Sequence, residues 1–475
     1  MLALVLLVLI VIGFTGAAVG GGVVGYHLKR SSASSCKTNA PETALWQQLS
    51  LPGIVSHLQS LQTIATKNGG TRSISSPGFN ASLTYVKKQL QDHTNLVLTV
   101  QPFSLNVSVA LSPPFFSMLE PRDEQYTAKD FSVLEFSSSS EVTSTVVAAN
   151  NNGCDQNDYP PSTAGKISLI ARGGCLFFEK VDNAIRAGAR GVLIFNLPDQ
   201  IGPVDGTLYN PESVTVFSIS NRLGQELLYT PNALLHMSYQ SEVRTVYTAN
   251  LIAETRSGTP DSIVTVGSHL DSAEGPGLND NGSGSSAILQ MALQFEDVVK
   301  KPVNKVRFIW YGAEEEGLVG SSFYVNSLTP SQRGKIVLNL NFNMLGSPNY
   351  IRGILNCSET KGGTLIMDTF AEFFDANSLA YQITPLDYSS DYSPYLNAGI
   401  PAGAIDTGAG RIKTAEERSR FGGILDIPFD PCYHQSCDTI DNVHTGVLHE
   451  TAQAATYALE HFATIKSIRD YFSSK

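Results

Sequence analysis

The sequence predicts an α/β fold in which a mixed, mostly parallel central sheet is flanked by helices on both faces. From Leu251 onward, apolar strands alternate with helical segments in DSIVTVGSHL, SSAILQMALQFEDV, VNKVRFIWYGA and IVLNLNFNML. This alternation is typical of parallel strands covered on both faces. Between residues 126 and 248 the chain instead consists of short β-rich runs broken by Pro, Gly and Asn, which predicts a separate inserted module.

The segments before this module predict helices followed by a strand. Residues 45–90 carry apolar side chains at helical spacing in LPGIVSHLQSLQTIA and LTYVKKQLQ, separated by the loop NGGTRSISSPGF. LVLTVQPFSL then alternates apolar and polar residues, as a half-buried strand does. Within the inserted module, CLFFEKVDNAIRAGA predicts one helix.

Composition limits the classes of protein to which the chain can belong. Of its 475 residues, 42% are hydrophobic and only 16% are charged, which excludes intrinsic disorder and requires a large core. The formal net charge is −11 and no segment is rich in Lys and Arg. We therefore expect no nucleic-acid partner, because binding phosphates needs a concentrated basic surface.

The amino terminus is a long apolar segment. No charged residue occurs in Leu2–Tyr26, and a bilayer core needs about 20 apolar residues. Two alternatives stay open: a signal peptide cleaved near Ala17 or Ala18, or an uncleaved anchor that would be the chain's only attachment to a membrane. The length favours the anchor, whereas the positive pair Lys29 and Arg30 favours the cytoplasmic side at that point.

The cysteines indicate the compartment. Cys432 and Cys437 enclose only YHQS, a spacing that suits a tight disulfide loop or a metal clip. Together with the apolar amino terminus, the disulfide is favoured, and it places the bulk of the chain in the secretory pathway: secreted, or vacuolar or membrane-anchored on the lumenal or extracellular side. Sequons that could carry glycans occur at Asn80, Asn106, Asn281 and Asn356.

Polar residues that could carry chemistry occur at three places, namely at the ends of two predicted strands and in one loop. His269 and Asp271 end the first strand, and their side chains at i and i+2 point to one face. Asp280 lies in the glycine-rich loop GPGLNDNGSG, and Glu314 and Glu315 follow VRFIWYGA. Each feature alone fits an ordinary strand end or turn. In an α/β sheet, however, the reacting groups gather at the carboxyl ends of the strands.

The residue types at these strand ends predict a hydrolytic zinc centre. A further histidine, His434, lies between the paired cysteines near the carboxyl terminus. Imidazole and carboxylate ligands suit zinc and leave a position open for water. A carboxylate can bridge two ions, and an acid next to a ligand can act as the general base.

The motifs resemble those of a known family of enzymes. SHLDS, GPGLNDNGSG, YGAEEEGLVGSSFY, LNFNMLGSPN, SSDYSPYLNAGIPAGAIDTGAG and CYHQSCDTIDNV, in this order, look like the co-catalytic di-zinc aminopeptidases of the aminopeptidase Y and secreted leucyl aminopeptidase type. The resemblance covers about Leu251 to the carboxyl terminus and the segment around SPGFNASLTYV. It implies a sheet of the zinc exopeptidase type.

The inserted module is similar to a protease-associated domain in GKISLIARGGCLFFEKVDNAIRAGARGVLIFN. This similarity implies a disulfide between Cys154 and Cys175. The expected division is therefore a signal or anchor segment with linker at 1–41, the first part of the catalytic domain at 42–125, the protease-associated domain at 126–248 and the rest of the catalytic domain at 249–475.

The resemblance also implies a set of metal ligands. His269 would bind one zinc ion, Glu315 and His434 the other, and Asp280 both. The family has Asp at the third position of its NFDM-like strand, where this chain has Asn343. An amide oxygen can coordinate zinc but carries no charge, so we expect two zinc sites, of which the His269 site is the weaker.

The remaining roles that the resemblance implies concern the reaction. Glu314 would be the general base on a metal-bridging hydroxide, Asp271 would orient His269, and Tyr433 would stabilise the oxyanion. The implied activity is an aminopeptidase acting on peptides with hydrophobic amino-terminal residues. Tyr392 is a second departure, since the family usually has His after this Ser-Asp pair.

Two other functions remain as alternatives. One is a catalytically inactive binding protein that keeps the peptidase fold, favoured by the missing charge at Asn343. The other is a single-zinc acyltransferase such as a glutaminyl cyclase, against which the NDNGSG and AEEEG motifs and the insert argue. The sequence leaves the oligomeric state and the preferred amino-terminal residue open.

Overall fold

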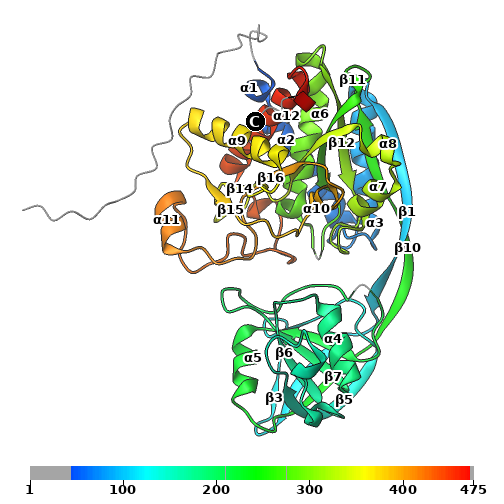
Figure 1. Ribbon diagram of the computed structural model, residues 1–475, viewed down its shortest axis with the longest axis vertical. Coiled ribbons are helices and arrows are strands. Elements are labelled where there is room, and N and C mark those ends of the chain that lie inside the picture. Colours follow the sequence, from blue (N-terminus) through cyan, green and yellow to red (C-terminus); the bar gives the residue numbers. More distant parts are fainter. Residues whose placement is uncertain (1–43, 209, 274, 471–475) are drawn as a thin grey trace, which may run out of the picture. The chain divides into compact units, whose positions relative to one another are not determined.

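A computed structural model describes residues 44–208, 210–273 and 275–470. The predicted signal or anchor segment, Leu2–Tyr26, lies outside the described residues. Within the described ranges, no helix combines the length and the apolar character needed to cross a bilayer. The framework consists of two eight-stranded mixed sheets with helices packed on them (Figure 1), which confirms the predicted fold class.

The first sheet contains the alternating strands predicted from Leu251 onward. Its strands are β1 (Val97–Ala110), β10 (Ser241–Glu254), β11 (Thr259–His269), β12 (Asn304–Tyr311), β13 (Ile336–Phe342), β14 (Gly353–Leu355), β15 (Gln382–Thr384) and β16 (Ala402–Asp406). Their order is β1-β10-β12-β11-β13-β16-β14-β15. The central strands β12, β11, β13 and β16 run parallel, whereas β10 and β14 join them antiparallel. The sheet is therefore mixed and mostly parallel, as predicted.

Helices cover both faces of this sheet because its central strands are apolar on both sides. Phe308 and Trp310 of β12 face one hydrophobic cluster, and Ile309 and Tyr311 face another. The first cluster includes side chains of α1 (Leu45–Gln48), α2 (Leu51–Lys67), α3 (Pro77–His93), α6 (Gly284–Val298), α9 (Lys361–Ala376) and α12 (Thr445–Thr464). The second includes side chains of α7 (Val319–Ser327) and α10 (Ser393–Asn397). Two short helices, α8 (Pro330–Arg333) and α11 (Ala415–Phe421), lie in connecting segments.

The inserted module forms the second sheet. Its strands are β2 (Phe115–Glu120), β3 (Glu124–Gln125), β4 (Phe131–Val133), β5 (Ser140–Ala148), β6 (Ile167–Ala171), β7 (Gly191–Phe195), β8 (Thr215–Ile219) and β9 (Leu234–Tyr239). They lie in the order β3-β2-β9-β5-β6-β7-β8-β4, so two strands that precede residue 126 belong to this sheet. Its helices are α4 (Phe177–Arg186) and α5 (Asn221–Leu228), with short turns η1 (Gln156–Asp158) and η2 (Pro161–Thr163).

Among the described residues, two disulfides are present: Cys154–Cys175 in the second sheet's module and Cys432–Cys437 near the carboxyl terminus. Both expected pairings are thereby confirmed, and the metal-clip alternative for the second pair is excluded.

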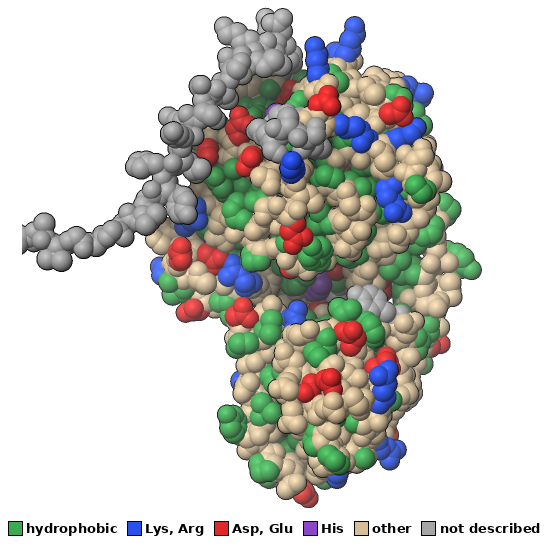
Figure 2. Space-filling model, viewed as in Figure 1, with side chains coloured by type: hydrophobic (Ala, Val, Ile, Leu, Met, Phe, Trp, Pro, Cys, Tyr) green, Lys and Arg blue, Asp and Glu red, His purple; other side chains and the backbone are tan. Residues whose placement is uncertain are grey.

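Acidic and basic side chains are scattered over the face seen in Figure 2 rather than gathered by sign.

Candidate metal centre

Three neighbouring parallel strands bring the predicted site residues to one edge of the first sheet. β11 ends at His269, which pairs with the last residue of β12, and Glu314 follows β12 in the next loop. Asn343 directly follows β13, whose Asn341 pairs with Gly267 of β11. Continuing that register places residue 343 beside residue 269. The carboxyl ends of parallel strands thus gather these groups, as the sequence predicted.

Asp280 lies between the two histidines. It belongs to the turn η3 (Leu278–Ser283) that leads into α6. Its Oδ1 is 3.4 Å from Nε2 of His269, and its Oδ2 is 3.2 Å from Nε2 of His434. The same His434 Nε2 is 3.1 Å from Oε2 of Glu315, and its Nδ1 is 3.6 Å from Oδ2 of Asp205. Each oxygen of Asp280 therefore faces a different imidazole.

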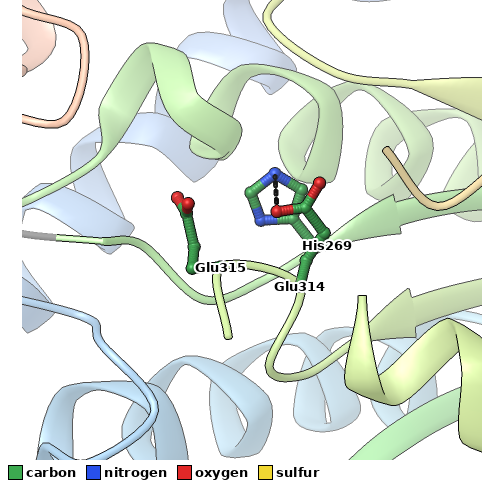
Figure 3. A group of neighbouring side chains, drawn as sticks. All are labelled: His269, Glu314 and Glu315. Carbon is green, nitrogen blue, oxygen red and sulfur yellow. Dashed lines mark ion pairs between the residues drawn. The ribbon is translucent and has the colours of Figure 1, made fainter. Parts of the chain in front are cut away.

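Two sets of side chains lie close enough to hold a cation. The first is His269, Glu314 and Glu315, and the second is Asp280, Glu315 and His434. Figure 3 shows Glu314 directed toward the His269 ring, with Glu315 on the same side of the sheet end. Oε2 of Glu314 is 3.9 Å from Nε2 of His269. Asn343 belongs to neither set, since the members of both are histidines and carboxylates.

The ligand spacing fits zinc. Zinc binds nitrogen and oxygen ligands tetrahedrally at roughly 2.0 to 2.2 Å, so two ligands of one ion lie about 3.3 to 3.5 Å apart. The contacts of Asp280 with the two histidines, 3.4 and 3.2 Å, are close to this separation. Both ring nitrogens of His269, Oδ1 of Asp280 and Oδ1 of Asn343 are buried without a hydrogen-bond partner. Unpaired buried polar atoms are costly, and an ion between them would satisfy these groups.

The electrostatics of the site also favour a cation. Burial raises the pKa of Glu314 well above its usual range, and burial raises that of Glu315 as well. Burial alone would lower the pKa of His269 and raise that of Asp280, but the carboxylates around His269 raise its pKa and the two histidines lower that of Asp280. Several carboxylates thus share one enclosed space, where a divalent ion stabilises their charged forms.

Asp271 lies beside His269, which it was expected to orient, and Tyr433, expected to stabilise the oxyanion, lies beside His434. Oδ1 of Asp271 is 3.7 Å from Nδ1 of His269, and its Oδ2 accepts a hydrogen bond of 3.2 Å from the backbone N–H of Glu315. Asp271 therefore contacts residues from both sets. The ring of Tyr433 stacks on that of His434 with centroids 3.9 Å apart, and burial raises the pKa of the phenol.

The loop that carries Asp280 is held by a carboxylate that sequence reasoning assigned no role. Asp438 is buried and accepts hydrogen bonds of 2.9 Å from the backbone N–H groups of Asn279 and Asp280. Asn279 in turn donates from its side chain to Asp430, at 2.6 Å. Asp438 directly follows the Cys432–Cys437 disulfide, so one segment positions both His434 and Asp280. The motif CYHQSCDTIDNV contained this residue, but nothing in the motif indicated its partner.

Arg72 is a second residue that sequence reasoning missed. It lies in the loop between α2 and α3, is fully buried, and donates to the backbone carbonyls of Leu270, Pro276 and Gly277. Burial lowers the pKa of its guanidinium to about 10, against the opposing effect of nearby carboxylates. An arginine in a polar loop carries no sequence signal for such a role, because its partners are backbone atoms about two hundred residues away.

Tyr392 does not approach the ring nitrogens of the site through its hydroxyl. Instead, the hydroxyl donates to Oδ1 of Asp387 at 2.5 Å and accepts from the backbone N–H of Ser389. It therefore stabilises the loop that precedes α10.

The fold and the cluster of histidines and carboxylates at the strand ends together define an α/β metallohydrolase site.

Comparison with known proteins identifies the family. Residues 250–459 match the model of peptidase family M28, and residues 142–227 match the PA domain. The chain is 38% identical over 432 residues to an aminopeptidase of Pseudomonas aeruginosa, covering 86% of this chain and 80% of that protein. It is 38% identical over 335 residues to leucine aminopeptidase 2 of Arthroderma otae, covering 68% and 67%.

Solved structures show the same fold. An aminopeptidase from Aneurinibacillus sp. strain AM-1 is similar with a TM-score of 0.71 at 24% identity, over 89% of this chain and 96% of that one. BSAP, a zinc aminopeptidase from Bacillus subtilis, is similar with a TM-score of 0.64 at 23% identity, over 88% and 96%. The chain belongs to peptidase family M28 and contains a PA domain. The resemblance drawn from the motifs, and with it the prediction of a metallo-aminopeptidase, is confirmed.

Proposed function

We propose that this protein is a zinc-dependent aminopeptidase that removes hydrophobic amino-terminal residues from peptides. The observation that carries the proposal is the position of Asp280, whose two oxygens each face a different histidine. Relatives named aminopeptidase and leucine aminopeptidase 2 support the reaction and the hydrophobic preference. A solved neighbour named as a zinc aminopeptidase supports the metal.

The proposed ligand sets follow from the contacts of Asp280. His269 and Asn343 would hold one zinc ion, Glu315 and His434 the other, and Asp280 both. The bound ions would lower the pKa of water and polarise the scissile carbonyl. Asn343 is the weak point, because a neutral amide replaces a charged ligand, and we propose that the His269 site binds zinc less tightly than the His434 site.

Glu314 is the proposed general base. It is buried in the loop after β12, and Figure 3 shows its carboxylate directed toward the His269 ring. Its raised pKa suits a group that must take the proton of the attacking water and pass it to the leaving amine. Asp271 would hold His269 and the backbone of Glu315 in place, and Tyr433 would donate to the developing oxyanion.

We also propose how the site selects the free amino terminus of a peptide. Its unprotonated amine would bind one of the metal ions and nearby carboxylates, whereas an internal peptide bond offers no such group. We further propose a secretory location and a domain boundary at residue 41. The expected boundaries at 125 and 248 are moved to about 114 and 240, because β2 and β3 lie in the second sheet and β10 lies in the first. The two disulfides support the secretory location, since disulfides persist in oxidising compartments.

An inactive binding protein is the second candidate, because the neutral Asn343 weakens the set of ligands. The test is zinc content together with hydrolysis of leucine 4-nitroanilide in added zinc, for the parent, Glu314→Gln and Glu416→Gln. We expect Glu314→Gln to lower kcat by about 10²-fold or more while zinc content stays at the parent's level. The exposed Glu416 is the matched control and its variant should keep parental activity. No hydrolysis by the parent, even with added zinc, would favour the binding protein.

A further inference from the structure

Asp391 is a buried carboxylate that the proposed reaction does not use. It lies between β15 and α10, and its side chain is fully enclosed. Neither of its oxygens accepts a hydrogen bond of good geometry, although the Ser321 hydroxyl lies near enough to interact. Buried charged groups are normally paired with an opposite charge or face a metal ion. A carboxylate so enclosed therefore needs a positive partner.

The electrostatic surroundings of Asp391 are those of the metal centre. The positive charge of His269 favours the ionised form of Asp391, whereas the carboxylates of Asp271 and Glu315 disfavour it. Asp391 in turn is among the carboxylates that act on Glu314. The negative charges thus outnumber the positive ones around Asp391, and a single imidazole cannot balance them.

The segment that carries Asp391 is joined to the end of β13. Nδ2 of Asn343 points to Oγ of Ser390 at 3.4 Å, and Nδ2 of Asn341 donates to the same oxygen at 3.0 Å. With its amide nitrogen directed to Ser390, Asn343 leaves Oδ1 buried and unpaired. The neutral amide oxygen and the unpaired carboxylate of Asp391 therefore come from two segments that meet at Ser390.

The charge of the ligand sets is uneven between the two proposed sites. Among the proposed ligands, the His434 site has the carboxylate of Glu315 in addition to its share of Asp280. The His269 site has its share of Asp280 and the neutral Asn343, while the nearby Glu314 is the proposed base and not a ligand. A divalent ion at the His269 site therefore lacks one negative charge. Asp391 is a carboxylate near His269 that has no hydrogen-bonded partner of its own.

We propose that Asp391 supplies the negative charge that Asn343 lacks and so retains zinc at the His269 site. Asp391 is not in either set of side chains close enough to bind a common ion. It would act as a positioning residue through its negative charge near His269, and not as a ligand of the ion. The inference rests on the proposed function only in naming zinc as the ion.

Zinc binding tests this inference without reference to catalysis. The metal-free full chain is titrated with zinc against a chromophoric chelator, for the parent, Asp391→Asn, Asn343→Asp and the double variant. We expect Asp391→Asn to weaken the lower-affinity site by about 10- to 100-fold, the usual effect of residues behind metal ligands, and to leave the tighter site unchanged. In the Asn343→Asp background, Asp391→Asn should weaken zinc binding at that site by less than about threefold. Unchanged affinity of the weaker site in Asp391→Asn would overturn the proposal.

Two controls separate this effect from damage to the fold. Asp406 is another carboxylate at this sheet edge, whose Oδ1 is satisfied by the backbone N–H of Gly408, so Asp406→Asn should leave both zinc affinities unchanged. If circular dichroism shows that Asp391→Asn is unfolded, the double variant decides: zinc affinity at the weaker site within about threefold of that of Asn343→Asp supports the proposal, and a larger loss contradicts it. A parent that binds two zinc ions but hydrolyses no peptide would contradict the proposed function and leave this inference standing.

Discussion

Replacing Arg72 by methionine should destabilise the metal loop. The side chain of Arg72 is fully buried, and its guanidinium donates to the carbonyls of Leu270, Pro276 and Gly277, with 2.7 Å from Nε to the oxygen of Pro276. Methionine fills similar space but donates nothing, so all three carbonyls lose the bond from Arg72, and that of Gly277 keeps only the backbone N–H of Gly282. It also removes a positive charge that faces the carboxylates of the site.

The cost can be worked from these contacts. A hydrogen bond from a charged donor contributes about 1.5 to 3 kcal/mol, and partial relaxation or water entry recovers some of the loss. Removing one partner of a buried charged network costs about 3 to 5 kcal/mol, and we expect that loss here. For a chain of this size, whose unfolding entropy is about 1 kcal/mol/K, it lowers Tm by roughly 3 to 5 °C.

Differential scanning calorimetry of the metal-free protein measures the effect. Arg186→Met is the matched control, because Arg186 is exposed on α4 and pairs only with Asp182 at 3.1 Å. Surface pairs of this kind contribute at most about 1 kcal/mol. If Arg72→Met changes Tm no more than Arg186→Met does, the argument that Arg72 holds the metal loop is refuted.

Two further predictions concern buried polar groups. Burial lowers the pKa of His57 to about 4. The unfolded chain therefore protonates this histidine at a higher pH than the folded chain does, and the free energy of unfolding falls by about 3 kcal/mol as the pH drops from 6.5 to 4. Urea unfolding at pH 7 and 4.5 should show a smaller fall for His57→Gln, and an equal fall would contradict the assignment. Asn281 is fully buried and donates to Ser268 Oγ at 2.8 Å; a glycopeptide map should find glycan at the exposed Asn80 or Asn106, and glycan at Asn281 would contradict the buried loop.

Much of the fold and most of the candidate site were predictable because their signals are local. Strands β11, β12 and β13 are rich in apolar residues, and His269, Glu314 and Asn343 lie at or just past their ends. Because the carboxyl ends of parallel strands meet at one edge of the sheet, these residues could be predicted to lie together. Asp280 and His434 were found through motifs rather than periodicity, since each lies in a loop whose path no local pattern specifies.

The groups that hold these residues in place could not be predicted. Arg72 and Asp438 act on backbone atoms far away in the chain, and a backbone partner leaves no trace in the identity of the residue. The same reason explains β2, which pairs with β9 more than a hundred residues later, and β3, which joins the second sheet by pairing with β2. Short strands are defined by their neighbours, and their own few residues carry little periodicity.

The central claim is a two-metal aminopeptidase whose His269 site is weakened by Asn343, and zinc titration of activity tests it most directly. Metal-free parent and Asn343→Asp are titrated with zinc while bound metal and hydrolysis of leucine 4-nitroanilide are followed together. We expect both proteins to reach full activity with two bound ions, and the variant to do so at about tenfold lower free zinc. Full activity of the parent with a single bound ion, or identical curves for the two proteins, would contradict the claim.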